Sequence, residues 1–557
     1  MRESTNTNQY VSGRAKSFRV AKAMLSFLLW SIVFGVSYTQ PALYYSNQNQ
    51  YFLHGLAHGD CGFLQDDWLA NTADPAPVFS GLVAFTYRHL SEAFFYVYYL
   101  LVLGVYFHAL VGIFSRVSGR PPTGLMRLGF IAIFVALHSA LLRWTSAQLF
   151  GVDYPWYLQA GVANQYLLGA GLQPSVFGVL LLLSIYTFLQ DRPLAAVTAS
   201  SLAAVLHSTY LLSAALLTLS YLYILGRDKR FREVCFTALL ALVIVAPVLA
   251  YNLRTFAPSS SQAFAESQHL LAHFRLPHHA EPILWFDGIA CAQVIGVLVA
   301  LFLVRGHRLF PILALPFTLS LVLTLVQMGT GNDTLALLFP WRTSAILVPL
   351  ATTIVLARLM NTSAVRFHPP TPVQGRVFQI VCGVLLAVFV AGGAAINYFD
   401  LGYRTNTQEL ALLEYIREHK AEGDVYLLPV EVPKLTSREK GAASRNFTPP
   451  PRRSTQNQDI SVDLQRFRLF TGAPIFIDFK SIPYKDVEVL EWHERVLWNH
   501  KLYEQRNWNA EQIEAELTQR HITHVVATTD RAIHCDALTL VHEDANYRLY
   551  RLRASPE

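Results

Sequence analysis

Residues 93–115 read AFFYVYYLLVLGVYFHALVGIFS and contain no Asp, Glu, Lys or Arg. A helix of about 20 apolar residues is long enough to cross the hydrocarbon core of a bilayer. The stretch therefore predicts a membrane-spanning helix. The composition agrees with this, because 53% of the chain is hydrophobic and only 15% is charged, whereas soluble proteins have roughly 25% charged residues.

Apolar segments of similar length recur on both sides of this stretch. Residues 193–226 form a longer apolar run broken by His207, Ser208 and Thr209, which predicts two short spans joined in a hairpin on the outer side. With these two, we expect about eleven spans. The other nine lie at 20–40, 93–115, 126–144, 174–190, 234–251, 285–304, 309–328, 337–359 and 376–397.

The charged residues divide the chain into two parts. Residues 1–397 hold 23 Lys and Arg and 14 Asp and Glu, whereas residues 398–557 hold 21 and 24 in less than half the length. The predicted fold class is an α-helical polytopic membrane domain over 1–397, with a large first outer loop at 41–92. A soluble α/β domain over 398–557 follows, because helical and strand-like patterns alternate there. A Ser-, Pro- and Arg-rich stretch at 434–461 predicts a flexible insertion in it.

The basic residues also predict the orientation, because Lys and Arg at the ends of spans remain cytoplasmic. With the N-terminus inside, 18 of them fall in inner segments and five in outer segments of the membrane domain. We therefore expect an integral membrane protein with a cytoplasmic N-terminus and a C-terminal domain on the outer side. No compact basic run is present, so we expect no nucleic-acid partner.

The first outer loop is the richest candidate for chemistry. Residues 51–57 are amphipathic and suit a helix that lies on the membrane surface. Asp60, Asp66, Asp67 and Asp74 follow within 15 residues. Such carboxylates act as general bases or bind a divalent cation, and Asp67 and Asp74 are the preferred catalytic pair. Asp66 and Asp67 are candidate ligands for Mg or Mn. The alternative is a solvated acidic loop in which Asp74 is a turn residue.

Arginines on the outer side form a second group of candidates. Arg342 starts a span in the stretch LLFPWRTSA, and we expect it to contact the phosphate of a lipid. Snorkelling to ordinary lipid phosphates is the alternative. His207, between two half-length spans, either lines a cavity or is a satisfied polar cap. The predicted substrate-binding residues are Arg342, Arg88, Arg143, Arg254 and His207.

This arrangement of spans, first outer loop and C-terminal domain resembles the GT-C superfamily of membrane glycosyltransferases, over nearly the whole chain. The resemblance implies a polyprenyl-phosphate-linked sugar as donor and a glycan, lipid or protein as acceptor. It also implies that an acidic residue of the first outer loop is the catalytic base or a metal ligand, and that Arg342 contacts the lipid phosphate. The DWLANTADP segment at 67–75 is also similar to a loop in a group of large bacterial membrane proteins.

One departure from the family keeps other functions open. Where aminoarabinose and mannosyl transferases have an acidic pair before the first surface helix, this chain has Asn47, Gln48, Asn49 and Gln50, which cannot act as bases. The leading hypothesis is sugar transfer with membrane lipids as partners. The alternatives are a transporter or a non-catalytic protein that handles lipid-linked glycans or other envelope lipids.

Overall fold

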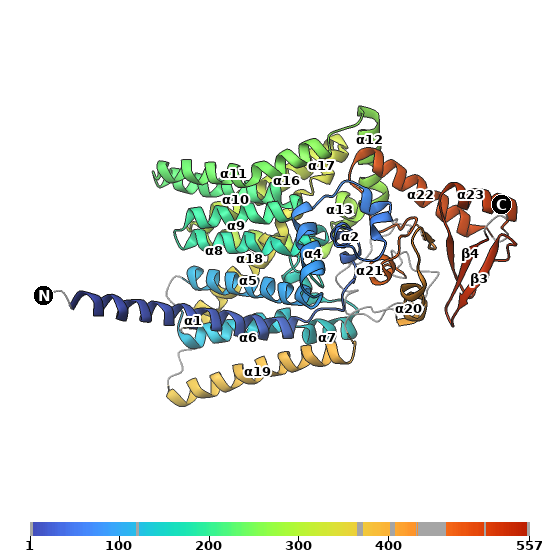
Figure 1. Ribbon diagram of the computed structural model, residues 1–557. Coiled ribbons are helices and arrows are strands. Elements are labelled where there is room, and N and C mark those ends of the chain that lie inside the picture. Colours follow the sequence, from blue (N-terminus) through green and yellow to red (C-terminus); the bar gives the residue numbers. More distant parts are fainter. Residues whose placement is uncertain are drawn as a thin grey trace.

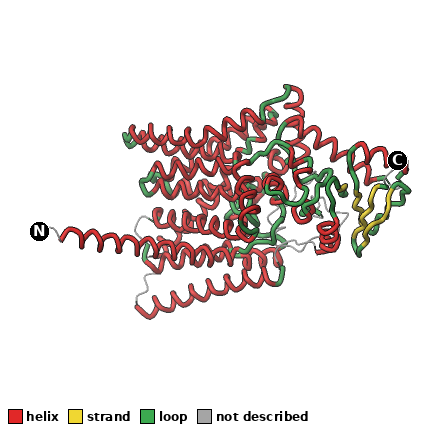
Figure 2. The backbone as a smooth tube through the Cα atoms, in the orientation of Figure 1, coloured by secondary structure: helices red, strands yellow, loops and turns green. Residues whose placement is uncertain are grey.

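The computed structural model describes residues 4–118, 122–364, 371–401, 407–430, 432, 464–505 and 508–553. Most of these residues are helical, and the longest helices lie side by side in one bundle (Figure 1). The predicted insertion at 434–461 lies outside the described residues. A smaller part with strands sits at the end of the bundle away from the N-terminus (Figure 2).

The predicted spans correspond to the apolar helices of the bundle. Among the described residues, seven helices are long and apolar enough to cross a membrane, and a pair bent by 49° makes an eighth. Three shorter apolar helices lie where further spans were expected, so by length and composition the described residues support seven or eight of the eleven expected spans. The seven are α1 (Ser4–Tyr38), α5 (Ala93–Val117), α10 (Leu211–Arg227), α11 (Phe231–Thr255), α16 (Leu309–Thr330), α18 (Ser344–Ala364) and α19 (Pro372–Tyr398). The bent pair is α6 (Gly124–His138) with α7 (Ala140–Phe150), and the short helices are α8 (Val179–Leu189), α9 (Pro193–Leu206) and α15 (Gly288–Leu303).

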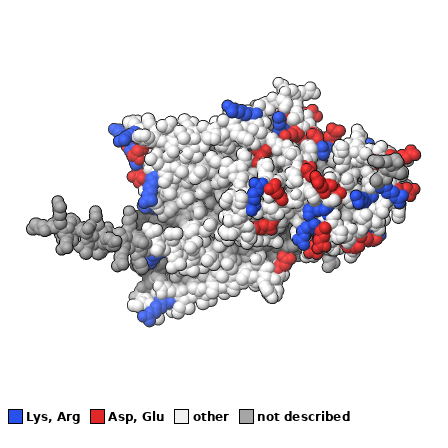
Figure 3. Space-filling model, viewed as in Figure 1, with Lys and Arg blue, Asp and Glu red and all other residues white. Residues whose placement is uncertain are grey.

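Charged residues are segregated along the bundle, as a membrane protein requires. In Figure 3 the middle of the bundle is almost free of charged side chains, while Lys and Arg mark the end nearer the N-terminus. Both signs of charge cover the opposite end and the C-terminal part. The chain is thus an integral membrane protein whose C-terminal part lies at one end of the spans.

The first outer loop folds against the interior of the protein. It contains α2 (Gln48–Tyr51), α3 (Leu53–His58) and α4 (Pro77–His89), with short 3-10 turns between α3 and α4. The amphipathic segment was predicted to lie on the membrane surface. Its apolar side chains are instead in the protein core, since Phe52, Leu53 and Leu56 are all 0% exposed.

The other outer segments are short helices and turns. They follow α7, α11 and α16 and pack near the C-terminal part. They are η3 (Tyr154–Leu158), η4 (Val162–Asn164), α12 (Ser261–His269), the π-helix η7 (Leu270–Arg275), α13 (Pro277–Ala280), α14 (Pro282–Trp285), α17 (Asp333–Leu337) and η8 (Pro340–Thr343).

The C-terminal part is a small α/β unit, as predicted. Its sheet has the order β1-β2-β4-β3, in which β1 pairs parallel to β2 and the other neighbours are antiparallel. The strands are β1 (Tyr426–Leu427), β2 (His524–Thr528), β3 (Leu538–Glu543) and β4 (Tyr547–Leu552). The helices are α20 (Leu410–His419), α21 (Phe467–Thr471), α22 (Asp486–Glu504) and α23 (Ala510–Gln519).

One expected strand is reduced to a single bridge. The sequence APIFIDF at 473–479 reads as a strand, but only Ile475 pairs with β1, through a bridge to Tyr426. The bridge uses the Pro474 carbonyl and the Phe476 N–H, and the Ile475 N–H donates instead to the carboxylate of Asp67, 3.0 Å away in the first outer loop. This segment therefore joins the two parts of the molecule and does not extend the sheet.

Candidate functional site

The four aspartates of the first outer loop do not form one acidic site. Asp67 is fully buried and accepts hydrogen bonds from the Arg468 Nε, 2.9 Å away, and from the backbone N–H groups of Leu69 and Ile475. Arg468 is itself buried and forms a second ion pair with Asp478 at 2.9 Å. Because its oxygens face an arginine and two N–H donors, Asp67 does not fit a site for Mg or Mn. The geometry favours a structural role.

The other three aspartates differ from Asp67 in their contacts. Asp60 is exposed and pairs with Arg88 at 2.7 Å. Asp66 is exposed, and Asp74 accepts a hydrogen bond from the Ala76 N–H at 2.8 Å, which is a turn contact. Within the described residues, no hydrogen bond or ion pair joins any of the four aspartates to Arg342.

The predicted basic residues also separate into different environments. Arg88 is part of the exposed pair with Asp60, and Arg254 is exposed near the end of α11. Arg143 is buried and donates to Asp153 at 2.8 Å, so its role in the described structure is an internal ion pair. Of the five, Arg342 and His207 lie close together, because both contact the ring of Tyr210.

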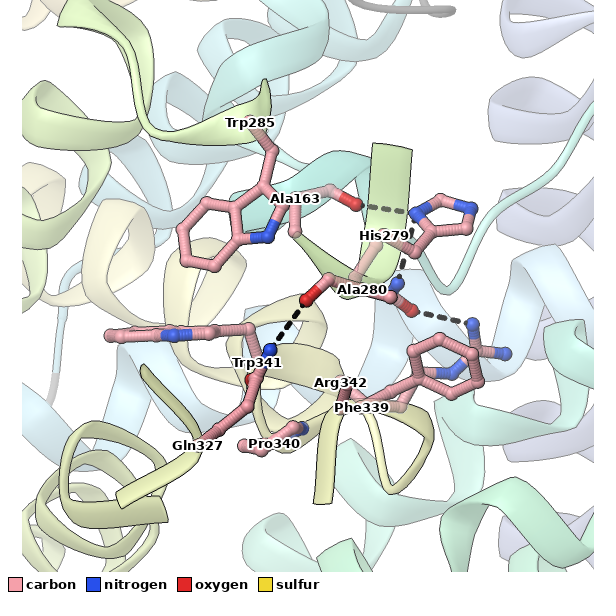
Figure 4. Close-up of a pocket in the computed structure, with 11 residues that line it drawn as sticks. Ala163, His279, Ala280, Trp285, Gln327, Phe339, Pro340, Trp341 and Arg342 are labelled. Atoms are coloured by element: carbon pink, nitrogen blue, oxygen red, sulfur yellow. Dashed lines mark hydrogen bonds between the residues drawn. The ribbon is translucent and has the colours of Figure 1, made fainter. Parts of the chain in front are cut away.

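Arg342 lines a cavity of about 230 Å³, its open mouth included, between η8, α13 and η4. Its guanidinium donates to the Gln165 side chain at 2.7 Å and lies over the Tyr210 ring. In Figure 4, Trp285 and Trp341 are on one side of this cavity and His279 and Arg342 on the other. Ligand pockets are usually about 300–1,000 Å³, and this cavity is smaller even with its open mouth included. It is lined by apolar and basic side chains.

Arg275 lies near His279 in the wall of this cavity, and Lys480 lies next to Arg275. Arg275, in η7, is 5% exposed and donates to the Lys480 carbonyl at 2.6 Å. Burial of the ring lowers the pKa of His279, and the charges of Arg342 and Arg275 nearby lower it further. The resulting pKa of His279 is about 4. Burial, and then the charge of Arg275, lowers the pKa of Lys480 to about 7. These residues, Arg275, Arg342 and Lys480, are called the junction cations below.

The junction cations lack carboxylate partners of their own. Within the described residues none of the three forms an ion pair, and the Nε atoms of Arg275 and Arg342 are buried without a hydrogen-bond acceptor. The nearby Asp478 is held by Arg468. Arg275 is buried, and Arg342 and Lys480 are half-buried. A buried charge without a partner of opposite charge is costly, so an anion bound among these three residues would stabilise them.

The amide residues Asn47 and Gln50 of the first outer loop border this same place. Gln50 donates to the hydroxyl of Tyr484 at 3.0 Å, and Asn47 donates to that of Tyr166 at 3.1 Å. Both hydroxyls lie near Tyr51. Burial raises the pKa of Tyr51 well above its ordinary value, and the nearby charge of Arg342 partly opposes this effect. The amides therefore form a neutral, hydrogen-bonding wall where an acidic pair would carry charge.

Sequence reasoning missed two of the junction cations. Arg275 is one of the five arginines that the predicted topology places in outer segments, where Lys and Arg are less common than in inner ones. That position alone was a sufficient reason to include it among the candidate residues. Lys480 carried no such signal because it lies in the soluble part of the chain. Only its position after the apolar run APIFIDF hints at burial.

Comparisons with known proteins found one family model and a similar solved structure. Residues 454–498 match a family described as a domain of unknown function, DUF6798. The chain is also similar to the crystal structure of ArnT from Cupriavidus metallidurans bound to undecaprenyl phosphate, at 11% identity and a TM-score of 0.39. That similarity covers 97% of this chain and 99% of ArnT. No curated protein matches the chain.

The described part of the matched segment, 464–498, includes the face that holds the C-terminal part to the first outer loop. It contains Arg468 and Lys480, and it also contains Glu488, which accepts from the Ala73 N–H at 3.0 Å. Gly62 and Gly472 touch here, and a Cβ on Gly62 would lie 2.4 Å from the Gly472 oxygen. This face is therefore closely fitted to the first outer loop.

Proposed function

We propose that the junction cations bind the phosphate of a polyprenyl-phosphate-linked sugar and that the chain transfers this sugar to a glycan, lipid or protein acceptor. The observation that supports this most is the group of three cations at the junction of spans and C-terminal part, none with a carboxylate partner in the described structure. A lipid phosphate satisfies such cations by charge-assisted hydrogen bonds. The aromatic wall of Trp285 and Trp341 suits an apolar or sugar-ring neighbour.

The proposed orientation places this site on the periplasmic side of a bacterial inner membrane, with the N-terminus in the cytoplasm. The Lys and Arg residues at the end of the bundle nearer the N-terminus support it (Figure 3). Labelling of a cysteine introduced at the exposed Gln65 by an impermeant reagent in intact cells tests this orientation.

The proposed catalytic acids are the aspartates of the first outer loop that form no ion pair with an arginine in the described structure. Asp60 and Asp67 are held by arginines, so Asp74 and Asp66 are the better candidates to accept the acceptor's proton. A second function, binding of a lipid-linked glycan without transfer, is favoured by one observation. The wall formed by Asn47 and Gln50 next to the junction cations is neutral.

The first test measures binding of undecaprenyl phosphate to the purified chain in nanodiscs. Arg342→Gln removes one charged donor from the cavity and is expected to weaken binding about 10- to 100-fold, since hydrogen bonds to charged groups contribute about 1.5–3 kcal/mol. Arg275→Gln is expected to act in the same direction. Arg254→Gln is the matched control, because it is an outer arginine that is exposed and away from the cavity.

Equal binding by the wild type, Arg342→Gln and Arg275→Gln would refute the proposed phosphate site. Transfer is tested separately by Asp74→Asn and Asp66→Asn in the native host. Loss of surface glycan with accumulation of the lipid-linked sugar supports transfer. Unchanged glycans in a double variant that still binds undecaprenyl phosphate would instead support the non-catalytic function.

Lys480 should make this binding depend on pH. Because burial and Arg275 lower its pKa to about 7, the side chain is largely neutral in the free protein above that pH. An anion favours the charged form, so binding takes up a proton. Affinity is expected to fall by up to about tenfold per pH unit above pH 7. Binding isotherms between pH 6 and 9 measure this.

The matched variant for the pH dependence is Lys480→Arg, which keeps the charge at every pH in this range. Its affinity should vary only with the titration of the lipid phosphate itself. A wild-type profile that coincides with that of Lys480→Arg would mean that Lys480 does not contact the anion.

A further inference from the structure

A second group of polar residues lies on the outer face, where α12 and η7 meet α17. His269 and His273 are one helical turn apart, and their rings are 4.5 Å apart. The His269 Nδ1 lies 3.2 Å from one oxygen of Asp333, and the His273 Nε2 lies 2.8 Å from the other. The three ligand atoms are all within 4.8 Å of one another.

These residue types in this arrangement match the ligand set of a transition metal. Two histidines four residues apart on one helical face, with a carboxylate from another segment, supply three ligands and leave a fourth position open. Imidazole and carboxylate ligands suit Zn²⁺ better than Mg²⁺ or Ca²⁺. In the part of the chain that the structure describes, this is the one group of three His, Cys, Asp or Glu residues that converges in this way.

A fourth residue is placed as an outer partner of such a site. Glu281 lies 2.7 Å from the His273 Nδ1, the ring nitrogen that faces away from Asp333. A carboxylate on the far nitrogen of a histidine fixes the ring and its tautomer, and this is the usual support of metal-bound histidine. Ordinary hydrogen bonds to Glu281 and Asp333 would be enough to hold His273. They give no reason for His269 to point at the same Asp333 carboxylate, whereas a shared metal ion does.

We propose that His269, His273 and Asp333 bind one Zn²⁺ ion, with Glu281 as the positioning residue for His273. The ion would join two segments that continue into the walls of the Arg342 cavity. The helix that carries His273 leads into α13 with His279 and Ala280, and α17 leads into η8 with Arg342. The site is independent of the proposed function, since its ligands are not the junction cations.

The test measures Zn²⁺ bound to the full-length, tag-free chain after treatment with EDTA and dialysis against ZnCl₂. We expect one ion per wild-type chain by mass spectrometry of the metal, and at least a tenfold weaker affinity in His273→Ala and in Asp333→Asn. Glu281→Gln should lose about tenfold, as outer partners of metal ligands do. The control is His534→Ala, which removes an exposed histidine of the C-terminal part.

Two further readouts keep the test valid where a variant folds poorly. Zn²⁺ should raise the melting temperature of the stripped wild type and not that of His273→Ala. Co²⁺ added to the stripped wild type should give the visible absorption of a tetrahedral site. Absence of bound Zn²⁺ in the wild type, or the same stoichiometry and affinity in His273→Ala and Asp333→Asn, would overturn the proposal.

Discussion

Asp67→Ala is expected to lower the free energy of unfolding by about 3–5 kcal/mol, the effect of removing one partner from a buried ion pair. Arg468 is 2% exposed, and after the substitution Asp478 is its one remaining carboxylate partner among the described residues. The N–H groups of Leu69 and Ile475 also lose their acceptor. Because these contacts join the first outer loop to the C-terminal part, that part should loosen first. Unfolding in mixed detergent micelles, followed by tryptophan fluorescence, measures the change.

The adjacent residue provides the control for Asp67. Asp66→Ala removes an exposed carboxylate and is expected to change stability by no more than about 0.5 kcal/mol. If Asp67 were instead a catalytic base, Asp67→Asn would abolish sugar transfer while leaving the unfolding transition of the chain unchanged. That result would reverse the structural assignment made above.

The spans could be predicted from the sequence because the bilayer imposes a simple rule. Each span must satisfy its backbone hydrogen bonds within one helix and present about 20 apolar residues, so composition alone locates residues 93–115 and the other apolar segments. Even the break at His207 is visible, because a polar run interrupts the apolar residues. The structure has extended backbone at His207, which ends α9 there.

The candidate site could not be predicted to the same degree, because its partners are distant in the sequence. Asp67 and Arg468 are 401 positions apart, and no local pattern reports that contact. A cluster of aspartates within 15 residues suggests a single acidic site, but each side chain leaves its short turn in a different direction. The junction cations show the same limit, since Arg275 and Lys480 meet only after the C-terminal part docks.

Arg143→Met is expected to destabilise the protein by about 3–5 kcal/mol, since it leaves Asp153 buried without its arginine. Arg143 is 2% exposed and Asp153 0% exposed, and the guanidinium also lies over the ring of Trp156 at 4.5 Å. Burial already raises the pKa of Asp153, and Arg143 lowers it. In the variant that pKa should rise further, so the loss of stability should be smaller at pH 5 than at pH 8. Unfolding curves at the two pH values measure this.

The double variant Arg143→Met/Asp153→Leu separates the ion pair from a role in lipid binding. Replacing both charges with apolar residues removes the buried unpaired carboxylate, so most of the lost stability should return. Arg254→Met, at an exposed outer arginine, is the control and should remain within about 0.5 kcal/mol of the wild type. If Arg143 bound a lipid phosphate instead, Arg143→Met would weaken lipid binding with little change in stability, and the second substitution would restore nothing. Because Asp153 already occupies the guanidinium, we expect the recovery of stability.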